Sequence, residues 1–223
     1  MQNNLGYASQ TAASSVQINS VLRNTYLLLS MTLLFSGAMA FVAMKMNFPF
    51  MGPLITLGGY FALLFLTSWL RNSAWGILSV FALTGFMGLT LGPLLNAYMN
   101  FLSNGSEIIM LALGGTGVIF LAMSGIALTT KRDFSGMGKF LFIGILVAFI
   151  AALANIFLQI PALSLAVSSM FMLLMAGLIL YETQQIARGG ETNYIMATVT
   201  LYVSIYNLFT SLLHLLGVFA GED

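Results

Sequence analysis

The sequence contains no cysteine, a single histidine and very little charge. Without cysteine, disulfides, thiol catalysis and cysteine-bound metals are excluded. Asp, Glu, Lys and Arg together make up 6% of the 223 residues, whereas a soluble domain usually carries about 25%. The formal net charge of +1 gives no indication of nucleic acid binding. So little charge cannot cover the surface of a water-soluble fold, and the composition therefore excludes one.

What the sequence has instead is long apolar runs, with 59% hydrophobic residues overall. A helix needs about 20 apolar residues to cross the hydrocarbon core of a bilayer. Seven segments meet this requirement and are separated by short polar connections. The predicted spans are 25–45, 53–70, 74–99, 107–130, 140–158, 162–185 and 193–218. The sequence therefore predicts an all-α integral membrane protein, a seven-helix bundle that occupies residues 23–223.

The first 22 residues are polar and nearly uncharged, and they do not resemble a cleavable signal peptide. We expect them to form a flexible tail on the cytoplasmic side, because basic residues gather at cytoplasmic ends of spans. With seven spans, six of the seven basic residues fall on the side of the N-terminus, and Lys45 alone falls on the other. These six are Arg23, Arg71, Lys131, Arg132, Lys139 and Arg188. The C-terminus is then extracytoplasmic.

The last span carries a stripe of small and polar residues at helical spacing. Its members are Asn193, Ala197, Thr200, Ser204, Asn207, Ser211 and His214. Lipid cannot hydrogen-bond these side chains, so the stripe should face protein or water inside the bundle. The last helix is therefore predicted to be central, with the other six around it. The stripe is either simple packing between helices or a partly hydrated seam, and His214 is either a buried structural histidine or part of that seam.

Glu182 lies one to two turns inside the cytoplasmic end of the sixth span. A carboxylate at that depth needs either a partner or a proton. Arg71, at the cytoplasmic end of the second span, is the best basic candidate in the sequence. The other interpretation is that Glu182 reaches water and pairs with nothing.

Known catalytic and metal sites find little support. The spans contain no pair of aspartates, and one histidine cannot build a histidine-based zinc site. Ser124 and His214 could in principle form a catalytic dyad, but the residues around Ser124 have the pattern of ordinary helix packing, which argues against it. We therefore predict a protein that is not an enzyme and that holds no cofactor and no metal.

Several motifs together resemble the transmembrane Bax inhibitor motif family. They are "GGETNYIMATVTLYVSIYNLF" in the last span, "LILYETQQI" before it, "LTGFMGLTLGPLLN" in the third span and "ANIFLQIPAL" across the fifth and sixth. The similarity extends from Val21 onward. It implies a seven-helix bundle with the last helix at its centre. It is strongest to a bacterial branch that modulates an FtsH-type, membrane-bound ATP-dependent protease, which implies the bacterial inner membrane, with a periplasmic C-terminus.

The family is also associated with a pH-sensitive calcium leak, attributed to two facing carboxylates. The resemblance assigns the first position to Glu182 and the second to Ser204, and it places Arg71 where a latch to the first carboxylate would be. A serine cannot share a proton with Glu182 as a second carboxylate would. The departure at Ser204 therefore puts a proton-switched calcium pore in doubt.

Two functions follow. In the first, the protein inhibits the protease as a poorly degraded substrate that is engaged through residues 1–22. In the second, it is a calcium or cation leak with the polar stripe as its path and Glu182 as its gate. Membrane lipid, the protease complex, calcium and a second copy of the chain are the partners considered.

Overall fold

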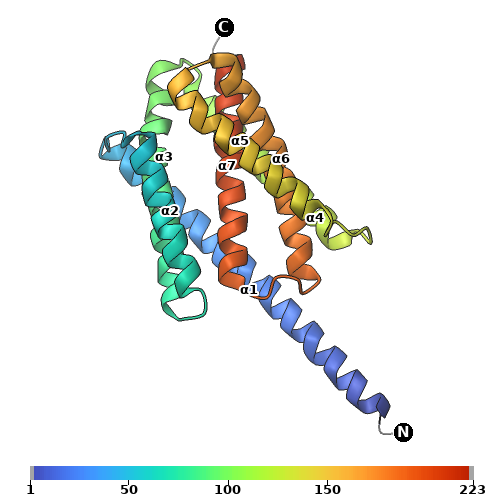
Figure 1. Ribbon diagram of the computed structural model, residues 1–223. Helices are drawn as coiled ribbons and strands as arrows, with labels where there is room; N and C mark the ends of the chain where they lie inside the picture. The colour runs from blue at the N-terminus through green and yellow to red at the C-terminus, as the bar shows by residue number, and fades with distance from the viewer. Residues whose placement is uncertain (1–2, 221–223) are drawn as a thin grey trace.

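The computed structural model describes residues 3–220, and side chains from residue 17 onward. Within this range the chain forms seven helices and no strands (Figure 1). They are α1 (Asn3–Lys45), α2 (Gly52–Leu70), α3 (Trp75–Phe101), α4 (Gly105–Thr129), α5 (Met137–Leu158), α6 (Pro161–Ala187) and α7 (Tyr194–Ala220). Each is long and apolar enough to cross a membrane, with α1 counted from Gln17. The predicted all-α bundle of seven spans is confirmed.

Predicted and observed boundaries agree within three residues, except at the start of α1. This helix begins at Asn3, so the segment 1–22 is helical from residue 3 onward. Residues 1 and 2 lie outside the described part of the chain. In Figure 1 the first part of α1 projects away from the other helices, at the end of the bundle where α2 joins α3 and α6 joins α7. The role of this segment as a tail remains a prediction.

The last helix is central, as predicted. Of all its residues, Phe219 alone is fully exposed, and residues from one end of α7 to the other are buried. The predicted ring of six helices is only partly formed, however. α7 packs mainly against α6, α4 and α1, and to a smaller extent against α3. α2 packs on the outer side of α3, and α5 packs on the outer side of α6.

Close packing joins α1 to α3, the pair of helices with the most extensive contact. Gly88 lies against the backbone carbonyl of Ser36, and Gly92 lies against Ala43, so that no side chain would fit at either position. The glycine spacing in the third span therefore serves close approach of helices within the bundle.

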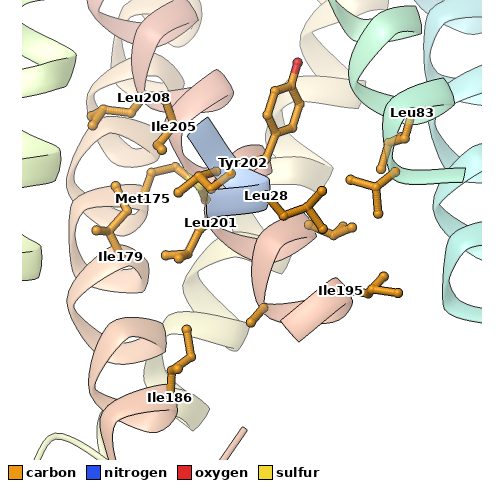
Figure 2. Packing of buried hydrophobic residues seen from close by; sticks show 14 of the residues in the cluster. Leu28, Leu83, Met175, Ile179, Ile186, Ile195, Leu201, Tyr202, Ile205 and Leu208 are labelled. Carbon is orange, nitrogen blue, oxygen red and sulfur yellow. The ribbon is translucent and has the colours of Figure 1, made fainter. Parts of the chain in front are cut away.

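The main apolar core is formed by α1, α3, α6 and α7 (Figure 2). Tyr202 of α7 is its largest fully buried side chain. Its hydroxyl lies 2.6 Å from Ser36 Oγ of α1 and donates to the Thr84 carbonyl oxygen of α3 at 3.2 Å. The one polar atom of this side chain is thus satisfied, which is what allows a tyrosine to occupy the centre of a membrane bundle.

Candidate functional site

Buried and half-buried members alternate along the polar stripe of α7, and two of its polar side chains bond to carbonyl groups of their own helix. Ser204 is completely buried, and its Oγ donates to the Thr200 carbonyl oxygen at 2.8 Å. The Asn207 amide donates to the Val203 carbonyl oxygen, also at 2.8 Å. Bonds of this kind satisfy polar atoms without a ligand. Ser204 and Asn207 therefore need no ligand to satisfy their side chains, and whether the stripe is a packing surface or a hydrated seam stays a prediction.

His214 lies near the far end of the same stripe, beside α6. Its Nδ1 is 2.8 Å from Ser168 Oγ, and its Nε2 is 3.4 Å from Ser164 Oγ. Ser124, the serine considered with it in the sequence, is instead 3.5 Å from Thr183. Since Thr183 and Ser164 lie on nearly opposite ends of α6, a dyad of Ser124 with His214 does not form.

Asn193 begins the stripe and caps α7. Its Oδ1 accepts hydrogen bonds from the backbone N–H groups of Ile195 and Met196, both at 3.1 Å. Its Nδ2 donates to the backbone carbonyl oxygen of Arg71 at 3.1 Å. Arg71 is thus joined to the start of α7, but through its backbone and not its guanidinium.

Glu182 is nearly buried, with 9% of its surface exposed. Within the described part of the chain its carboxyl group makes no hydrogen bond and no ion pair, so neither Arg71 nor Ser204 is its partner in this structure. Glu191, in the turn between α6 and α7, carries the next carboxyl group along the chain. Glu191 itself accepts a hydrogen bond from the backbone N–H of Asn193 at 2.6 Å. Glu191 is thus the acidic residue nearest to Glu182 along the chain, and its carboxyl group bonds to the start of α7.

The residues beside Glu182 form contacts that the sequence analysis missed. Thr183 is fully buried and lies 3.3 Å from the hydroxyl of Tyr26 in α1. Gln184 is also buried and bonds to the backbone of the α4–α5 loop at Arg132 and Phe134. Three successive side chains on a helix point in three directions, so all three are buried only where a helix is surrounded. The sequence signal was present as the run "ETQ" at the end of an apolar segment.

Three adjoining cavities extend along the side of α7 that faces α2 and α5. Their volumes are about 850, 450 and 300 Å³. The first two share Tyr60 and Val203 in their walls, and the last two share Thr90 and Tyr206. Phe61 of α2 and Phe149 of α5 meet across this side, with ring centroids 5.8 Å apart. Thr200 and Asn207 are the members of the α7 stripe that line these cavities.

Acidic and histidine side chains do not assemble into a metal centre in the described residues, where no three of them come together. The two carboxylates of Glu182 and Glu191 have four oxygen atoms between them. A bound calcium ion takes about six to eight oxygen ligands. The geometry therefore offers an isolated buried carboxyl group rather than a formed ion site.

Comparison with known proteins gives a consistent result over nearly the whole chain. Residues 18–221 match the Bax1-I family, described as inhibitor of apoptosis-promoting Bax1. The chain is 49% identical to the Modulator of FtsH protease YccA of Escherichia coli, over 97% of each chain. It is 47% identical over the full length of both chains to an uncharacterized protein of Pseudomonas aeruginosa, and 31% identical to one of Helicobacter pylori. Together with the seven spans and the central last helix, these matches show that the chain belongs to the Bax inhibitor family.

Proposed function

We propose that the protein is a non-enzymatic regulator in the bacterial inner membrane, which binds and inhibits an FtsH-like ATP-dependent protease. The observation that carries this proposal is the 49% identity to a protein named for modulation of that protease, over nearly all of both chains. A relative from another Escherichia coli strain, also 49% identical, is named Inner membrane protein YccA. In this proposal the chain is a substrate that the protease engages but degrades poorly.

The first part of α1 is the segment proposed to be engaged. α1 has 43 residues, or about 65 Å at 1.5 Å per residue, which is about twice the thickness of a hydrocarbon core. Its apolar, membrane-crossing part starts at Gln17. Ile18 lies against Gly189 in the α6–α7 turn, so contact with the bundle is already made at the start of that part. Residues before it project from the bundle in Figure 1 and are accessible to a partner at the predicted cytoplasmic end.

The rest of the chain has the packing expected of a poor substrate. Extraction from the membrane by pulling on α1 must separate it from α3, where Gly88 and Gly92 hold the two backbones together. It must also break the bonds of α1 to Tyr202 and Thr198 in the central helix. A protease that starts on the projecting segment would therefore meet the most extensively packed helix pair first.

Deletion of residues 2–20 tests the proposal. We expect the truncated protein to lose inhibition of protease activity on a second membrane substrate. Its helical content should fall only by the deleted part of α1, and the thermal stability of the bundle should be retained. A matched variant keeps the length but permutes the order of residues 2–16. If this variant still inhibits, the protease recognises the length of the segment and not its sequence. Full inhibition by the truncated protein would rule out engagement through this segment.

A cation leak is the second candidate. It is favoured by the adjoining cavities along α7 and by the Glu182 carboxyl, which has no hydrogen-bond or ion-pair partner among the described residues. In this alternative, ions follow the side of α7 lined by Thr200 and Asn207, and Glu182 controls access at the end predicted to be cytoplasmic. Calcium flux into liposomes between pH 6 and 8 tests it. Flux that responds to Glu182→Gln, and becomes steeper in pH with Ser204→Asp, would favour a leak. The absence of flux in the wild type would eliminate it.

A further inference from the structure

The α4–α5 loop carries the densest positive charge in the described structure. Lys131, Arg132 and Lys139 lie within nine residues and are all exposed. Below they are called the loop cations. Among the described residues none of the three forms an ion pair. The first turn of α5, which contains Lys139, has no acidic residue. Apart from the Arg132 guanidinium, which lies 5.8 Å from the centroid of the Phe134 ring, the positive charge of this loop has no contact within the described residues that uses it.

The one acidic residue of the loop is already neutralised. Asp133 forms an ion pair with Arg188, with Nη1 and Oδ1 2.9 Å apart. Hydrogen bonds from the backbone and side chain of Ser135, together with the charge of Arg188, hold the pKa of Asp133 below its usual value. Asp133 is therefore ionised at neutral pH and is occupied by Arg188. It does not cancel the charge of the loop cations.

The loop is held in place by α6. The Gln184 side chain donates to the Arg132 carbonyl oxygen at 2.9 Å and accepts from the Phe134 N–H at 2.7 Å. The Arg188 guanidinium donates to the carbonyl oxygens of Arg132 at 2.9 Å and of Lys131 at 3.3 Å. These bonds fix the loop backbone, so the loop cations start from a restricted arrangement and lose less freedom when an anion binds.

The position of the loop indicates which anion it meets. The loop joins two membrane-crossing helices, and the exposed side chains just beyond it are apolar: Leu128 on α4, and Phe140, Phe142 and Ile143 on α5. Phe140 is 70% exposed, directly beside Lys139. Apolar side chains face acyl chains, so the cations beside them lie at the level of lipid headgroups. Clusters of basic residues at such a position attract anionic phospholipids.

We propose that the loop cations bind the headgroup of an anionic phospholipid, whose acyl chains lie along the exposed face of α5. The phosphate and any further negative charge of the headgroup are contacted by Lys131, Arg132 and Lys139. The site is separate from Glu182 and from the projecting part of α1, and it is independent of the proposed protease inhibition.

The test measures lipid selectivity directly. The full chain is reconstituted in bilayers of phosphatidylcholine with a minor fraction of spin-labelled phosphatidylglycerol or phosphatidylcholine. The ratio of protein-associated to free label is then compared for the two lipids. We expect phosphatidylglycerol to be preferred and the preference to fall with added salt. Each substitution Lys131→Gln, Arg132→Gln or Lys139→Gln should lower the preference about fivefold at most, and the triple variant should abolish it.

A matched triple variant removes three exposed cations elsewhere: Arg23→Gln, Arg71→Gln and Lys45→Gln. It should retain most of the preference for phosphatidylglycerol. Equal loss in both triple variants would overturn the proposal in favour of a general charge effect. Unchanged preference in the loop variant would also overturn it. Thermal melting of each variant in neutral detergent identifies any that are not folded, and the single substitutions then decide the outcome.

An acidic protein segment is the other occupant that this charge could attract. Poly-glutamate added to protein in pure phosphatidylcholine bilayers distinguishes the two. Binding of the peptide that depends on the loop cations, without any preference between the two lipids, would refute the lipid site. A lipid preference that poly-glutamate does not reduce would support it.

Discussion

Helices α2 and α7 are almost equally apolar by mean hydropathy, yet they have opposite surroundings. In α2, Thr67 alone is buried, whereas α7 has twelve buried residues and only the side with Thr200, Val203 and Asn207 is half-buried throughout. The two helices differ in where their polar side chains lie. α7 carries serine, threonine, asparagine and histidine along its membrane-crossing length, and these require protein or water around them. In a membrane bundle, buried position is thus indicated by polar residues within a span more than by hydrophobicity.

The largest expected effect compares the same substitution in the two helices. Leu201→Ala in α7 removes a side chain with 0% exposure, and Leu54→Ala in α2 removes one with 69% exposure. The first should leave a cavity and cost about 2–5 kcal/mol, towards the lower end because lipid is as apolar as the core. The second should change the free energy of unfolding by less than about 0.5 kcal/mol. Thermal unfolding in detergent measures both. Equal losses would contradict the central position of α7.

A second prediction concerns glycine. Gly88 lies against the Ser36 carbonyl group, whereas a Cβ added at Gly125 of α4 would meet nothing within 4 Å. Gly88→Ala should destabilise the bundle by about 1–3 kcal/mol because α1 and α3 must move apart. Gly125→Ala should be neutral or slightly stabilising, since alanine favours the helix. The same thermal assay separates them, and a neutral Gly88→Ala would show that α1 and α3 tolerate separation.

The third prediction concerns the joint between α6 and the α4–α5 loop. Gln184→Ala leaves the Phe134 N–H and the Arg132 carbonyl without their partner, which should cost about 1–2 kcal/mol. Hydrogen exchange at Phe134 should also become faster. Gln17→Ala, in an exposed position, provides the comparison. Unchanged exchange at Phe134 would mean that Arg188 holds the loop without Gln184.

The smallest effect is expected at Asp133. Its lowered pKa means that the folded state favours the ionised form, so its contribution to stability is present above the pKa of the unfolded chain. That contribution is lost as the pH falls through the lower pKa of the folded state. Wild type should therefore melt slightly above Asp133→Asn at pH 7. The difference should start to shrink near the unfolded pKa of about 3.9 and disappear only below the lower pKa of the folded state. If the difference in melting temperature between wild type and Asp133→Asn grew at low pH, the pKa of Asp133 would be raised and not lowered by folding.

The seven spans were predictable because each is a long apolar run bounded by short polar turns. The central position of α7 was predictable from Ser204 and its neighbours in the stripe. The partners of individual polar groups were not predictable, because they depend on the rotation of each helix about its axis. Arg71 and Glu182 lie at the same end of the bundle, but Arg71 uses its carbonyl for Asn193 and its guanidinium does not meet Glu182.

The start of α1 was also missed by the sequence analysis. Residues 3–17 are polar and contain no proline, so hydrophobicity gave no reason to expect a helix there, and nothing in the sequence prevented one. The contacts of Gln184 with the α4–α5 loop depend on backbone atoms of a distant segment. Backbone atoms are the same for every residue type, so the sequence of the α4–α5 loop could not indicate its contacts with Gln184.

The continuity of α1 has a mechanical consequence. A helix that runs without a break from residue 3 into the bundle transmits axial force to its buried part, with no slack segment to absorb it. Because α1 lies alongside α3, such force acts in shear on many contacts at once, instead of peeling them apart one after another. A pull on this end would therefore load the contacts between α1 and α3 along the helix axis.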